Sequence, residues 1–78
     1  MIKINWNEFK AFKKESDNVH KRDNFGLLIE FLRAFYSVTD VHDLYNSLKN
    51  DDLSQMMLEK RNITSVVILE KYLKKRFS

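Results

Sequence analysis

The chain has no proline, no cysteine and only one glycine among its 78 residues. All-β domains need many tight turns, which use glycine and proline, so this composition favours an all-α fold. The lack of cysteine excludes a disulfide framework, a thiolate zinc site and a cysteine nucleophile. A chain of this length is enough for one small domain. We therefore expect residues 1–78 to form a single helical domain without a linker.

Apolar residues recur at helical spacing in several segments, which are separated by polar residues typical of helix ends. The predicted fold is a compact all-α domain of about five short helices, and residues 16–24 are expected to form its longest loop. The segment 25–38 is apolar around most of its circumference, so we expect it to be buried at the centre of the fold. The predicted helices span residues 6–15, 25–38, 41–49, 53–61 and 64–76.

Polar residues before four of these helices match helix N-caps, and Thr39 or Asp40 is expected to cap the helix at residues 41–49. Asn5–Glu8 and Asp52–Gln55 each fit a capping box, in which the first side chain accepts a backbone amide and the last reaches back. The central helix is expected to be capped by Asp23 or Asn24.

Two asparagines follow helices directly, at positions where glycine is usual. Asn50 comes after the segment 41–49, and Asn62 comes after the segment 53–61. Because asparagine tolerates the left-handed conformation, we expect both residues to end their helices in place of glycine.

No cluster of residues in the sequence fits a catalytic or cofactor site. His42 has Asn46 four residues further on, which is a poor metal ligand, and His20 lies in the charged loop, so both are interpreted as surface histidines. Gly26 stands alone, so no glycine-rich loop can hold a phosphate. Helix capping explains the pair Asp51–Asp52 better than acid–base chemistry does. We therefore expect no enzymatic activity, no cofactor, no metal and no small-molecule substrate.

The C-terminal part of the chain is basic, although the net charge is only +3. Several cations on one face suffice for salt-dependent binding to phosphates with little sequence preference. The other explanation is that these side chains only solvate the surface and interact with helix dipoles. The C-terminal basic candidates are Lys60, Arg61, Lys71, Lys74 and Lys75. A second basic cluster contains Lys10, Lys13, Lys14, Lys21 and Arg22.

The apolar content of the chain is high for its size, at 44%. Met56 and Met57 are adjacent, so one of them must point away from the main apolar face of its helix, and Val67 and Ile68 likewise flank theirs. Adaptable methionines and exposed aliphatic groups suit a surface that binds a partner.

The leading hypothesis is a small non-enzymatic helical binding protein, either a regulator or an accessory factor. It engages a macromolecular partner, most readily another protein, through its C-terminal helices. The alternative is a nucleic-acid-binding protein that uses the basic C-terminal face on the phosphate backbone. A sequence-specific helix-turn-helix is not expected, because the helix that would enter the groove begins with the apolar run Val66–Leu69.

The sequence contains no apolar run of about 18 residues, so no membrane-spanning helix is predicted. Residues 1–6 contain no apolar stretch typical of a signal peptide. We therefore expect a cytoplasmic protein that does not enter membranes.

Overall fold

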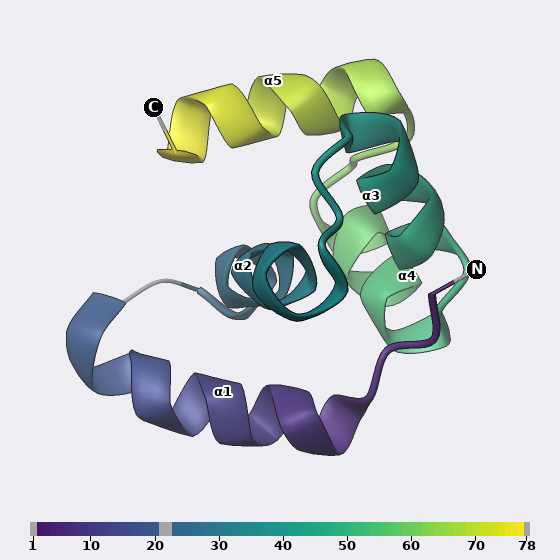
Figure 1. Cartoon of the computed structure of the whole chain (residues 1–78). Helices are drawn as coiled ribbons and strands as arrows, with labels where there is room; N and C mark the ends of the chain where they lie inside the picture. The colour runs from purple at the N-terminus through teal and green to yellow at the C-terminus, as the bar shows by residue number, and fades with distance from the viewer. Residues whose placement is uncertain (1, 21–22, 78) are drawn as a thin grey trace.

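The computed structural model describes residues 2–20 and 23–77, and these residues form helices and no strand. The all-α class predicted from the sequence is confirmed. The helices in chain order are α1 (Trp6–His20), α2 (Asn24–Tyr36), α3 (Val41–Lys49), α4 (Asp52–Lys60) and α5 (Val66–Phe77). Figure 1 shows α2 in the middle, with α1 on one side, α5 on the opposite side, and α3 and α4 together at one end.

Helix α2 is the centre of the core, as its apolar sequence predicts. Its buried run, residues 25–29, covers more than one full helical turn, so neighbouring elements cover this part of the helix on several sides. Phe31 is fully buried, and its ring lies 5.6 Å from the ring of Phe9 and 5.5 Å from that of Phe12, both on α1. This aromatic packing attaches α1 to the central helix.

Helix α1 is longer than predicted, and the loop expected at residues 16–24 is correspondingly shorter. The helix continues to His20 instead of ending near residue 15. Its last five residues, 16–20, contain no glycine or proline that would break the helix. The polar composition of this segment is therefore compatible with a helix as well as with a loop. Lys21 and Arg22, part of the second basic cluster, lie outside the described residues.

The first capping box forms around Asn5, with one change from the standard pattern. The side-chain oxygen of Asn5 accepts from the backbone amides of Asn7 and Glu8, both at 3.1 Å. The carboxylate of Glu8 accepts from the Asn5 side chain at 3.2 Å. The backbone amide of Asn5 donates instead to the hydroxyl of Tyr36, at 3.1 Å, which connects the start of α1 to the end of α2.

The second capping box was predicted to begin at Asp52, which is one residue after the observed N-cap. The N-cap of α4 is Asp51, whose carboxylate accepts from the amide of Ser54 at 3.0 Å. Ser54 is fully buried and its hydroxyl donates to the carbonyl of Leu48, which fixes the register of α4 against the end of α3. Gln55 points along the helix toward Glu59 and does not reach back.

Of the two asparagines predicted to end their helices in the left-handed conformation, one prediction is confirmed and the other is wrong. Asn62 has φ 57° and is left-handed, as expected, whereas Asn50 has φ −87°. The side chain of Asn50 instead donates to the carbonyl of Asn46 at 2.7 Å, which satisfies an end carbonyl of α3 without a left-handed residue. Ser37 is also left-handed, with φ 55°, and α2 ends before it at Tyr36, two residues earlier than predicted.

Candidate functional site

An apolar hollow of about 590 Å³ lies between the start of α1 and the outer side of α4. Leu53 and Met56 are large apolar residues that remain 52% and 64% exposed. Trp6 and Met57 are half-buried and pack against the core behind them. Contiguous exposed apolar side chains of this kind are typical of a surface that binds another molecule. The lining residues are Trp6, Leu53, Met56, Met57, Glu59 and Lys60.

Trp6 forms one wall of this hollow, and two contacts hold its indole ring in a fixed position. Its indole nitrogen donates to the carboxylate of Asp51 at 3.1 Å. Its ring packs edge to face on Phe9, with centroids 5.5 Å apart and an interplanar angle of 89°. Since Asp51 also caps α4, a single carboxylate connects the wall of the hollow to the helix that forms its floor.

Asp51→Ala is expected to lower the free energy of unfolding by about 1–2 kcal/mol, because α4 loses its N-cap. The indole of Trp6 also loses its acceptor, so its fluorescence is expected to shift to the red. Trp6 is the only tryptophan, so emission spectra report on this wall alone. Asp40→Ala is the matched control, because Asp40 is the N-cap of α3 but makes no side-chain cap hydrogen bond. Equal losses of stability for the two variants would contradict the role assigned to Asp51.

The four apolar residues predicted to bind a partner lie at two different places in the structure. Met56 and Met57 line the hollow, whereas Val67 and Ile68 lie at the start of α5 and do not line it. Val67 and Ile68 are nevertheless exposed, at 61% and 38%. Sequence reasoning missed Leu53, although its spacing from Met56 places both on one side of α4.

Sequence reasoning also missed the contribution of Trp6 to the site. Trp6 and Asp51 are 45 residues apart in the chain, and no local pattern connects them. The only available signal was that an aromatic residue began the first helix.

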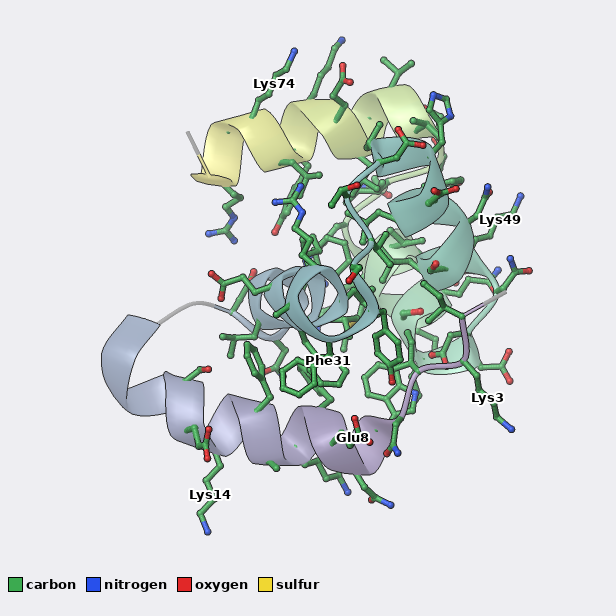
Figure 2. All side chains as sticks on the ribbon, viewed as in Figure 1. Lys3, Glu8, Lys14, Phe31, Lys49 and Lys74 are labelled. Carbon is green, nitrogen blue, oxygen red and sulfur yellow. The ribbon has the colours of Figure 1, made fainter. Side chains whose placement is uncertain are left out.

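The basic residues do not gather on one face. Lys71, Lys74 and Lys75 are exposed on α5, and the ammonium of Lys74 lies 3.8 Å from Glu70. Figure 2 shows Lys74 pointing away from the body of the protein on one side and Lys14 of α1 pointing away on the opposite side. Lys14 of the second cluster and Lys74 of the first therefore lie on opposite sides of the protein.

Arg61 differs from the other predicted basic residues because it points inward. Its guanidinium carbon lies 4.9 Å above the centre of the Phe25 ring, and one of its nitrogens donates to the carbonyl of Met57 at 3.1 Å. Another nitrogen lies 3.5 Å from the carboxylate of Asp23. With 23% of its side chain exposed, Arg61 holds the end of α4 against α2.

Asp23 connects three helices through its carboxylate. One oxygen accepts from the amide of Gly26 at 2.8 Å and caps α2. The other lies 2.9 Å from a nitrogen of Arg76 on α5 and also faces Arg61. Burial raises the pKa of Asp23, but the Gly26 hydrogen bond and the positive charges of Arg76 and Arg61 together lower this pKa below its ordinary value.

Within the described residues, no group of three or more histidine, aspartate or glutamate side chains is arranged to hold a metal ion. In that same part of the chain, none of the helices has the length and apolar character needed to cross a membrane. Comparison of the chain with protein-family models, with curated proteins and with solved structures finds no match.

Proposed function

We propose that this chain is a small non-enzymatic binding protein that engages another protein through the apolar hollow between α1 and α4. The observation that carries the proposal is the exposure of Leu53 and Met56 beside the fixed indole of Trp6. Phe35, Val67 and Ile68 are also exposed but lie elsewhere, whereas Leu53 and Met56 line one hollow together with Trp6 and Met57. Methionine side chains adapt to the shape of a partner at low cost.

The hollow favours a helical segment as the bound element. An amphipathic helix places its apolar residues along one side and fits an apolar groove lined by side chains at helical spacing. Glu59 and Lys60 at the edge of the hollow supply one charge of each sign for the flanks of such a segment. The role that follows is that of a regulator or accessory factor.

Met56→Glu is expected to abolish capture of the partner, because it places a charge in the middle of the apolar surface. The first test is affinity capture from the native host, with the unchanged protein and the variant as baits. The captured protein is then added stepwise to this chain, and binding is followed by the change in Trp6 fluorescence. Phe35→Glu is the matched control, because Phe35 is also a large exposed apolar residue, at 56%, but does not line the hollow. Loss of capture with Phe35→Glu but not with Met56→Glu would contradict the proposal.

A second candidate function is binding to nucleic acid through the exposed lysines of α5. The supporting observation is that Lys71, Lys74 and Lys75 all face solvent. Changing these three residues together to glutamate discriminates between the two functions. If that triple variant loses a salt-dependent interaction with DNA or RNA while Met56→Glu retains it, the α5 surface is the binding site.

A further inference from the structure

The C-terminal end of α5 lies over α2 and away from α3 and α4 (Figure 1). Leu69 and Leu73 of α5 are buried in the core, whereas residues 74–76 are exposed. The position of the last turns of α5 therefore depends on the contacts that its side chains make with the N-terminal part of α2.

Tyr72 and Arg76 make these contacts. The ring of Tyr72 packs edge to face on that of Phe25, with centroids 5.4 Å apart and an interplanar angle of 75°. Arg76 donates to the hydroxyl of Tyr72 at 3.2 Å, and another of its nitrogens lies 2.9 Å from the carboxylate of Asp23. The side chains of Arg76 and Asp23 are 54% and 34% exposed, so water and salt reach this ion pair.

One carboxylate oxygen of Asp23 is shared between α5 and α4. Its Oδ2 atom lies 2.9 Å from a nitrogen of Arg76 and 3.5 Å from a nitrogen of Arg61, so the two arginines compete for one acceptor. Arg61 is held in place without α5, because it stacks over Phe25 and donates to the carbonyl of Met57. The other oxygen of Asp23 caps α2. If Arg76 moves away, Asp23 keeps both a positively charged partner and its cap.

From this geometry we infer that residues 72–77 of α5 form a latch, which opens without unfolding the rest of the domain as Asp23 passes from Arg76 to Arg61. Opening leaves no buried charge unpaired, since the half-exposed guanidinium of Arg76 moves into water. It uncovers Phe25 and Leu73, and the burial of these two side chains keeps the latch closed in most molecules. The inference does not depend on the proposed function, because α5 does not line the hollow.

Native-state amide hydrogen exchange tests whether the latch opens by itself. A local opening exposes little surface, so exchange of the amides of residues 73–77 is expected to depend weakly on urea at concentrations well below the unfolding transition. The amides of residues 28–32 in the buried part of α2 exchange through global unfolding, so their exchange is expected to depend strongly on urea.

Arg76→Gln tests what holds the latch closed. The substitution removes the charge that pairs with Asp23 but keeps a side chain of similar helix propensity. Exchange of the amides of residues 73–77 is expected to become about threefold to fivefold faster, the effect of losing a partly exposed ion pair. Lys75→Gln is the matched control, because it removes an exposed positive charge from the same turn and changes the interaction with the helix dipole equally. It is expected to leave these rates nearly unchanged.

Arg61→Met tests the passage of Asp23 between the two arginines. The unbranched methionine still covers Phe25, but the open state now contains an Asp23 carboxylate without Arg61. Exchange of the amides of residues 73–77 is therefore expected to become about twofold slower than in the unchanged protein. The amides of α2 are expected to exchange faster in the same variant, because global unfolding no longer breaks the contacts of Arg61 and so becomes easier.

Three results would overturn the latch. The first is a urea dependence for residues 73–77 that equals that of α2, because this end would then open only with the whole domain. The second is an equal response to Arg76→Gln and Lys75→Gln. The third is an Arg61→Met variant that accelerates exchange in α5 as much as in α2, since Asp23 would then not pass to Arg61. Far-UV circular dichroism checks that the three variants remain folded.

Discussion

Phe31→Ala is expected to lower the free energy of unfolding by about 3–5 kcal/mol. Phe31 is fully buried in the middle of α2, and its ring contacts the rings of Phe9 and Phe12 on α1. Removing it leaves a cavity between the two helices that the neighbouring aromatic rings cannot fill. A domain of this size has a total stability of about 3–5 kcal/mol, so the variant is expected to be largely unfolded at 25 °C. Urea denaturation followed by circular dichroism measures the loss.

Phe35→Ala is the matched control for this prediction. Phe35 is on the same helix and its ring lies 4.8 Å from that of Phe31, but the side chain is 56% exposed. Its removal leaves no closed cavity, so a loss of about 1 kcal/mol or less is expected. If the two variants lost similar amounts of stability, α2 would not be the centre of the core.

Asp23→Ala is expected to cost about 2 kcal/mol of stability at neutral pH. The substitution removes the N-cap of α2, at about 1 kcal/mol. It also leaves Arg61 without its carboxylate in a half-buried position over Phe25, which adds a penalty of about 1 kcal/mol. Asp23→Asn keeps a side chain that can cap the helix but removes the charge, so it is expected to cost about half as much.

The cost of Asp23→Asn is expected to depend on pH in a defined direction. Because the folded-state pKa of Asp23 is lowered, its charge stabilises the protein at every pH above the unfolded-state value of about 3.9. This stabilisation is lost as the pH falls through the folded-state pKa and the carboxylate becomes protonated. Denaturation at a series of pH values therefore measures a constant difference from the unchanged protein above about pH 5, which shrinks below about pH 4. A difference that grew on acidification would contradict the assignment.

The predictions from sequence succeeded where a local signal was sufficient. The bounds of α3 match residues 41–49, and the absence of glycine made the left-handed role of Asn62 predictable. The central position of α2 followed from its sequence, since a helix that is apolar around most of its circumference must be covered on several sides.

The predictions failed where two local structures fitted the same residues equally well. Asp51 and Asp52 can both act as N-caps, and the burial of Ser54 against the end of α3 selected Asp51. Asn50 was expected to be left-handed, but its side chain bonds the helix end directly. Residues 16–20 of α1 were assigned to a loop because a polar composition does not distinguish a helix from a turn.

The candidate site was only partly visible in the sequence. Met56 and Met57 were singled out because two adjacent methionines cannot both face the core. Trp6 could not be connected to them, since its position beside α4 results from packing across the fold and from the hydrogen bond to Asp51. Arg61 was counted with the free cations, although the fold turns it toward Asp23 and Phe25.

The sequence by itself determined the class of this protein, the identity of its central helix and the lack of the residues that disulfide and thiolate-metal chemistry require. These properties depend on composition and on spacing within single helices, and both are local. Only the tertiary structure decided which side chains lie next to one another: it brought Trp6 to α4, turned Arg61 inward and placed Lys14 of α1 and Lys74 of α5 on opposite sides. Relative positions of this kind depend on how helices pack, and packing is set by long-range contacts that no local pattern records.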